Sequence, residues 1–270
     1  MTGIRQGWER AAPSYRTGFA RALTEISEAL ARMLPSPLPG PVLDLACGPG
    51  TAMAEISRHH GQIFSVGCDF SHNMAVFARK AVEKGQGVVA DQGRLPFAPG
   101  TFGTVVSSMG TIFSRDPAAQ LKNLSLILRE AGHLAFSAWG EPHETPIREV
   151  SRNIVSLWPY PLSQVVPPLE TPYSQGESSW LSDSAREACF AICSVTSHWL
   201  PFRFADREEA ARALTGTGRM ALLTEGDPRK ERELLALARE AFRPYEDPRS
   251  GRVELASRYH LFHLVRLASR

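Results

Sequence analysis

The first half of the chain alternates short, continuous apolar runs with segments whose apolar residues recur at helical spacing. The apolar runs lie near residues 42, 66, 88, 105 and 134, and turn residues or a polar stretch follow each of them. Short runs of this kind are typical of parallel strands buried on both faces, and the helical segments between them are typical of crossover connections. The pattern predicts an α/β protein with a mostly parallel sheet.

The second half of the chain departs from this pattern. Five prolines fall between residues 159 and 172, which rules out a core strand or a long helix there. We expect a cap over the active-site edge, although a surface loop whose aromatic side chains simply pack down is an open alternative. The predicted division is an N-terminal helical arm (1–34), a sheet domain (35–140, 186–205 and 253–270) and a substrate cap (141–185 and 206–252).

One stretch combines the end of a buried strand with a glycine turn and the start of a helix: Val42-Leu43-Asp44-Leu45-Ala46-Cys47-Gly48-Pro49-Gly50. Glycines in such a turn allow a ligand to approach the backbone, and the free N–H groups of the following helix face it. A dinucleotide-binding fingerprint would need a third glycine, where this chain has Met53. Asp44 would also repel a pyrophosphate and attract an ammonium group. A ligand with an amino-acid end and a nucleoside end therefore fits better than NAD.

These residues resemble motif I of the class I S-adenosylmethionine (SAM)-dependent methyltransferases, D-x-x-x-G-x-G. Three later stretches agree with that family in order and spacing, and they are Val66-Gly67-Cys68-Asp69, Val88-Val89-Ala90-Asp91-Gln92, and Leu95-Pro96-Phe97 with the strand from Phe102 to Met109. The chain is thus similar to small-molecule methyltransferases of the ubiquinone/menaquinone C-methyltransferase-like, type 11 group.

The resemblance implies a Rossmann-like sheet of seven strands in the order 3-2-1-4-5-7-6, with a helical cap inserted after strand 5 and between strands 6 and 7. It implies SAM as cofactor, with S-adenosylhomocysteine as product. Asp69 would bind the ribose, and Asp91 with Gln92 would face the adenine. Tyr15, in the arm, either reaches the cofactor or belongs to an amphipathic helix that only packs. The implied cofactor-binding set is Tyr15, Asp44, Ala46, Cys47, Gly48, Gly50, Asp69, Phe70, Met74, Asp91, Gln92 and Ser108.

Methyl transfer needs an aligned nucleophile and a dry site, and it needs a general base only when the nucleophile is neutral. His143, just beyond the fifth strand, is the candidate base. The acceptor is expected to be a small, apolar or aromatic metabolite, held by Phe113, Trp158, Tyr160 and Tyr173. Two other functions stay open: a SAM-binding enzyme of the pericyclase or decarboxylase type, and a SAM sensor without catalysis.

The amino-acid composition limits the classes of partner that we expect for this chain. Thirty Lys and Arg against 28 Asp and Glu leave a net charge of +2, which does not favour a nucleic-acid partner. We expect no membrane span and, because the first residues lack an apolar signal core, a cytoplasmic protein that is a monomer or a homodimer. The four cysteines, at 47, 68, 189 and 193, form no C-x-x-C pair, so we expect no metal.

Overall fold

Seven strands form one sheet in the computed structural model, which describes residues 2–162 and 171–268. They are β1 (Val42–Leu45), β2 (Ser65–Asp69), β3 (Gly85–Val89), β4 (Phe102–Ser107), β5 (Leu128–Trp139), β6 (Phe190–Phe204) and β7 (Val253–Arg266). Their order in the sheet is β3-β2-β1-β4-β5-β7-β6, which confirms the predicted topology. The pairs from β3 to β5 are parallel, and β7 runs antiparallel to β5.

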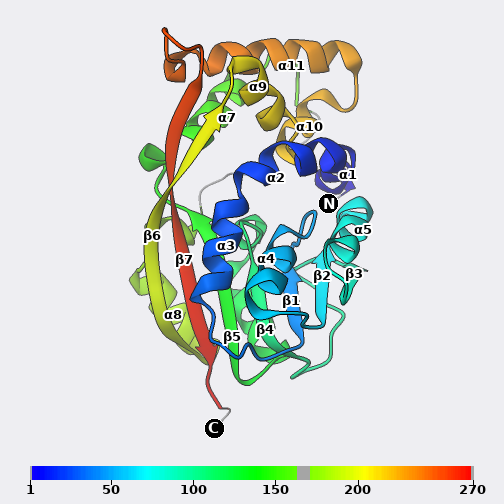
Figure 1. Cartoon of the computed structure of the whole chain (residues 1–270), viewed down its shortest axis with the longest axis vertical. Coiled ribbons are helices and arrows are strands. Elements are labelled where there is room, and N and C mark those ends of the chain that lie inside the picture. The colour runs from blue at the N-terminus through cyan, green and yellow to red at the C-terminus, as the bar shows by residue number, and fades with distance from the viewer. Residues whose placement is uncertain (1, 163–170, 269–270) are drawn as a thin grey trace. The chain divides into compact units, whose positions relative to one another are not determined.

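Three helices precede β1, and further helices connect most of the later strands (Figure 1). The α-helices are α1 (Thr2–Thr17), α2 (Phe19–Ala22), α3 (Thr24–Met33), α4 (Thr51–His60), α5 (His72–Ala81), α6 (Pro117–Ile127), α7 (Pro146–Ser156), α8 (Ser179–Glu187), α9 (Arg207–Thr215), α10 (Gly218–Thr224) and α11 (Pro228–Ala241). Short 3₁₀ helices are η1 (Thr111–Phe113), η2 (Pro142–Glu144), η3 (Pro172–Gln175) and η4 (Arg243–Tyr245).

The chain divides into two compact units. The sheet unit comprises Thr24–Gly140, Glu170–His198 and Tyr259–Arg270, and the helical unit comprises Met1–Leu23, Glu141–Leu169 and Trp199–Arg258. This division differs from the predicted one in four places: residues 24–34 and 170–185 belong to the sheet unit, and residues 199–205 and 253–258 belong to the helical unit. Residues 163–170 of the predicted cap lie outside the described residues.

The core of the sheet unit is built on its central strands. Every residue of β1, β2 and β4 is buried, as expected for parallel strands covered on both faces. Figure 1 shows α3 and α4 in front of the sheet, and α3 packs against both α4 and β5. Buried side chains of β5 and β7, including stacked Phe136 and Phe262 at 4.6 Å between ring centroids, extend this core.

Capping residues set the helix starts that matter for the site. Ser71 caps α5, because its hydroxyl accepts a hydrogen bond from the backbone N–H of Met74 at 3.2 Å. Asp116 caps α6 in the same way, accepting from the N–H of Ala119 at 2.9 Å, with Pro117 in the first turn.

Residues 146–156 form α7, a helix within the predicted cap, and Pro146 begins this helix rather than breaking it. Its buried face carries apolar side chains at helical spacing, namely Ile147, Val150 and Ile154. After α6 the chain passes directly from Ile127 into β5. The third strand, β3, ends at Val89, two residues before Asp91.

None of the helices in the described ranges, 2–162 and 171–268, combines the length and the apolar character that crossing a membrane would require.

Candidate functional site

The glycine loop between β1 and α4 has an unusual backbone. Ala46, Gly48 and Gly50 all have positive φ, at 52°, 52° and 87°. The left-handed region is accessible to glycine without steric cost, whereas other residues rarely adopt it. Two backbone hydrogen bonds define the turn, from Gly50 N to the carbonyl of Cys47 and from Cys47 N to the carbonyl of Cys68, at 3.0 and 3.1 Å. The loop is thereby tied to the neighbouring strand β2.

Glycines on adjoining elements let the loop pack closely. A Cβ on Gly110 would lie 2.6 Å from Cβ of Ala46, and a Cβ on Gly67 would lie 2.9 Å from both Cys47 Sγ and Met53 Sδ. Gly67 thus makes room for Met53, which stands where a dinucleotide-binding helix has its third glycine. Our sequence reasoning missed both Gly67 and Gly110, whose only signal was a lone glycine inside or just after a strand pattern.

Asp44 is the last polar residue of β1 and is buried, with 1% of its surface exposed. Its Oδ2 has no hydrogen-bond partner among the described residues. The pKa of this carboxyl is raised to about 8, and burial is the largest cause. A hydrogen bond from the backbone N–H of Met53 lowers the pKa, and the charge of Asp69 raises it. Without a cation, the carboxyl therefore holds its proton at neutral pH.

Asp69, at the end of β2, is 6% exposed and holds two backbone groups. Its Oδ2 accepts from Gly48 N at 3.0 Å, and its Oδ1 accepts from Ser71 N at 2.9 Å. One carboxylate therefore links the glycine loop to the start of α5. The two neighbours that we predicted to contact cofactor differ in exposure, since Phe70 is half-buried and Met74 is buried.

The polar pair after β3 has a partner that the sequence did not reveal. Gln92 is half-buried, and its Oε1 accepts a hydrogen bond at 2.8 Å from Nε2 of Gln120 in α6. Gln120 itself is only 2% exposed. Asp91 shapes the turn, because its Oδ1 accepts from Gly93 N at 2.8 Å. A glutamine inside a helical apolar pattern gave no signal of this contact.

The end of β4 completes the site on the sheet unit. Ser107 is buried and donates from Oγ to the carbonyl of Leu45 at 2.8 Å, which joins β4 to the glycine loop. Ser108 is half-buried and accepts a hydrogen bond from Ser27 Oγ at 3.0 Å. Phe113, in η1, is 38% exposed. Strand ends, glycine loop and polar side chains thus belong to one unit, as expected at the carboxyl edge of a parallel sheet.

Comparison with known families identifies this unit. Residues 42–132 match the family described as methyltransferase domain, and the matched range includes the glycine loop, Asp44, Asp69 and the Asp91–Gln92 pair. Residues 42–132 are a class I methyltransferase domain. SAM is the cofactor of this class, in agreement with the resemblance seen in the sequence.

Relatives of the methyltransferase domain act on different acceptors. The demethylmenaquinone methyltransferase of Beutenbergia cavernae is 30% identical over 125 residues, which are 46% of this chain and 51% of that protein. The malonyl-[acyl-carrier protein] O-methyltransferase of Herminiimonas arsenicoxydans is 31% identical over 141 residues, 51% of this chain and 52% of that protein. The chain spans about half the length of the curated relatives it matches.

The fold of the chain is shared more widely than its sequence. The YcgJ protein of Bacillus subtilis superposes with a TM-score of 0.59 at 14% identity, over 91% of this chain and 100% of that chain. At this low identity the superposition shows that the chain shares the Rossmann-like fold, and it does not identify the acceptor.

Four predicted site residues lie outside the methyltransferase domain, in the helical unit, and they are Tyr15, His143, Trp158 and Tyr160. Tyr15 packs edge-to-face on Trp8, with 5.1 Å between ring centroids. His143 is exposed in η2. These observations do not test whether Tyr15 contacts the cofactor or whether His143 acts as a base, so both roles remain predictions.

Trp158 and Tyr160 lie together in the helical unit, with 5.3 Å between ring centroids. Trp158 is 8% exposed, and its indole Nε1 has no hydrogen-bond partner among the described residues. The Tyr160 hydroxyl donates to Oε2 of Glu233 at 2.5 Å. This hydrogen bond is the largest cause of a raised pKa at the Tyr160 phenol. The pair combines aromatic surface with one free buried donor, a combination suited to a partly polar aromatic ligand.

Tyr173, the fourth residue of the predicted acceptor set, lies in a different unit from Trp158 and Tyr160. It belongs to the sheet unit and is 1% exposed, with its ring packed against Phe136, Trp180 and Phe262. Burial raises the pKa of its phenol above the usual range. Tyr173 therefore anchors η3 to the core of the sheet unit, and its role at the acceptor remains a prediction.

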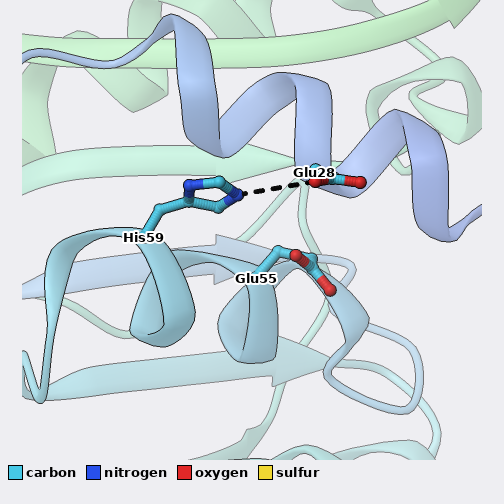
Figure 2. A group of neighbouring side chains, drawn as sticks. All are labelled: Glu28, Glu55 and His59. Atoms are coloured by element: carbon cyan, nitrogen blue, oxygen red, sulfur yellow. Dashed lines mark ion pairs between the residues drawn. The ribbon is translucent and has the colours of Figure 1, made fainter.

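One group of side chains among the described residues has a composition that could suit a metal. Figure 2 shows Glu28 of α3 facing Glu55 and His59 of α4. A terminal nitrogen of Arg58 already lies 2.8 Å from Glu28, 2.7 Å from Glu55 and 2.8 Å from Nε2 of His59. The guanidinium thus supplies the positive charge at this point, and we assign no metal to the cluster.

Proposed function

We propose that this chain is a SAM-dependent methyltransferase that transfers a methyl group to a small, apolar or aromatic acceptor. The observation that carries the proposal is the buried Asp44 carboxyl beside the glycine loop, one oxygen of which has no partner among the described residues. A buried acceptor without a donor is costly in a folded protein. A cationic ligand at the loop removes that cost, and the ammonium group of SAM has the required charge.

The residues around the loop fit the other parts of SAM. Asp69 is a buried carboxylate at the end of β2, beside the glycine loop, and carboxylate oxygens suit ribose hydroxyls. Gln92 and Asp91, half-buried after β3, offer amide and carboxylate groups to a base. The glycine loop has no bulky side chain between its backbone and a ligand. The proposed cofactor-contacting set on this unit is Asp44, Ala46, Cys47, Gly48, Gly50, Asp69, Phe70, Met74, Asp91, Gln92 and Ser108.

When bound, SAM supplies an electrophilic methyl group on a positively charged sulfur. The work left to the chain is to hold both reactants in line and to keep water out, and alignment alone contributes about 7–11 kcal/mol in favourable cases. No acid or base is needed for an anionic nucleophile. For a neutral one we assign the role of general base to His143, whose imidazole is exposed.

We assign acceptor binding to Phe113 of the methyltransferase domain and to the Trp158–Tyr160 pair of the helical unit. Phe113, in η1 after the end of β4, is a large apolar side chain that is 38% exposed and can contact an apolar acceptor. The relatives named above methylate a quinone precursor and a carrier-bound malonyl group. The aromatic pair favours the first kind of acceptor over the second.

A labelled-methyl transfer assay over a panel of quinols, phenols and carboxylic acids tests the proposal. We expect transfer to at least one aromatic member, lost in Gly48→Val and retained in Gly100→Val, which changes a glycine of similar φ (63°) with nothing within 4 Å of the added Cβ. Saturable SAM binding with no transfer to any acceptor would instead favour the non-methylating or sensor function.

A further inference from the structure

Gln120 is a buried amide for which the fold alone offers no reason. It lies in the first turns of α6, whose start is set by Asp116 and Pro117. Its side chain is 2% exposed, although glutamine is seldom buried to this degree. The contact that its side chain makes is the hydrogen bond from Nε2 to Oε1 of Gln92, 28 residues earlier in the chain, at 2.8 Å.

The hydrogen bond restricts what Gln92 can present to a ligand. An amide side chain can normally rotate by half a turn and exchange its donor and acceptor ends. Gln120 donates to the oxygen of Gln92, so this oxygen is held toward α6 and the NH₂ group of Gln92 keeps its two donors. The other end of Gln120, Oε1, is buried without a partner among the described residues. This uncompensated acceptor is a cost that a purely structural role would not require.

We infer that Gln120 is a positioning residue that determines the base specificity of the cofactor site by fixing the amide of Gln92. The inference rests on the proposed function, in which Gln92 faces the adenine. Adenine and hypoxanthine present opposite hydrogen-bonding patterns at N1 and at the exocyclic position. A fixed amide matches one pattern and rejects the other, whereas a freely rotating amide adapts to both.

The experiment compares two ligands on four proteins. S-adenosylhomocysteine and S-inosylhomocysteine differ only in the base, and calorimetry gives the dissociation constant of each for the wild type, Gln120→Met, Gln92→Leu and the double variant. We expect the wild type to prefer the adenine ligand by at least about tenfold. Gln120→Met should reduce this preference several-fold, and the double variant should lose no more than Gln92→Leu alone, because Gln120 acts through Gln92.

A matched control separates positioning from a general effect on α6. Ser125→Ala alters another buried polar side chain of the same helix, whose hydroxyl donates only to the carbonyl of Lys122 at 2.8 Å. This variant should keep the full preference for adenine. If Gln120→Met weakens both ligands equally, or if its effect adds to that of Gln92→Leu, the inference is wrong. A wild type that binds neither ligand would instead overturn the proposed function.

Discussion

The two units of the chain carry their proposed ligand contacts in different ways. In the sheet unit the groups that we propose to face SAM are backbone N–H groups, strand-end carboxylates and a glycine loop, all set by the path of β1, β2 and β4. In the helical unit the groups that we propose for acceptor binding are side chains on helices and their connections, such as Trp158 and Tyr160. A site made by the backbone leaves a motif in the sequence, whereas a site made by side chains on helices can be changed residue by residue. The first kind suits a common cofactor and the second a particular acceptor.

The largest expected effect comes from the glycine loop. Gly48→Val should weaken SAM binding at least about 100-fold, because it fills the approach to the loop and places a β-branched residue at φ 52°. The backbone strain alone should cost about 1–2 kcal/mol of unfolding free energy. Gly100→Val has the same kind of strain at φ 63° in open space and should bind SAM normally. Equal binding by both variants would show that the loop does not approach the ligand.

Replacing Asp69 should have the next largest effect. Asp69→Asn removes the charge and leaves one acceptor oxygen for Gly48 N and Ser71 N, so the loop and the start of α5 lose a shared anchor. We expect a loss of SAM affinity of about 10- to 100-fold, since a hydrogen bond to a charged group contributes about 1.5–3 kcal/mol. Asp116→Asn, at the cap of α6, is the matched control and should leave affinity unchanged. Calorimetry that finds the two variants alike would remove Asp69 from the site.

Asp44→Asn should affect stability and binding in opposite directions. Burial raises the pKa of Asp44 from 3.8 to about 8, so its contribution to stability is fully present below pH 3.8 and is lost as pH rises through about 8. The variant lacks this dependence and should gain stability relative to the wild type by about 1–3 kcal/mol at pH 8. It should also lose about tenfold in SAM affinity. Thermal unfolding at pH 5 and pH 8 measures the first effect, and a variant less stable than the wild type at pH 8 would contradict it.

The smallest effect is expected in the helical unit. Trp158→Phe removes the unpartnered indole N–H and keeps aromatic surface, so the acceptor KM should rise a few-fold while SAM affinity stays unchanged. Trp199→Phe changes a tryptophan of the same unit that is 57% exposed and should have no effect. A change in SAM affinity with a normal acceptor KM would show that Trp158 contributes to cofactor binding and not to acceptor binding.

The residues that could be predicted from sequence are those whose role follows from position along one strand and its turn. Asp44 lies in β1 and Asp69 ends β2, while Gly48, Gly50 and the Asp91–Gln92 pair lie in the turns after β1 and β3. The structure brings these elements to one edge of the sheet. The strand order was also predictable, because the family that these motifs resemble has this order. These features depend on local geometry that any parallel sheet must satisfy.

The residues that could not be predicted depend on contacts across the fold. Gln120 is known only through its hydrogen bond to Gln92, and Gly67 and Gly110 are known only through the atoms that pack on them. The contacts of Tyr173 were hidden for the same reason, since its proline-rich neighbourhood gave no sign that its ring packs on Phe136 and Phe262. Periodicity cannot reveal a partner that lies on another element.

The most direct test of the central claim, that the sheet unit binds SAM through the glycine loop and Asp44, is a calorimetric titration at pH 7 in two buffers of different ionisation enthalpy. We predict one saturable site per chain, a dissociation constant within the usual range of about 1 µM to 1 mM, and release of a proton on binding. The proton comes from Asp44, whose carboxyl is protonated at pH 7 and ionises beside the ammonium group. The absence of saturable binding, or binding whose enthalpy is the same in both buffers, would contradict the claim.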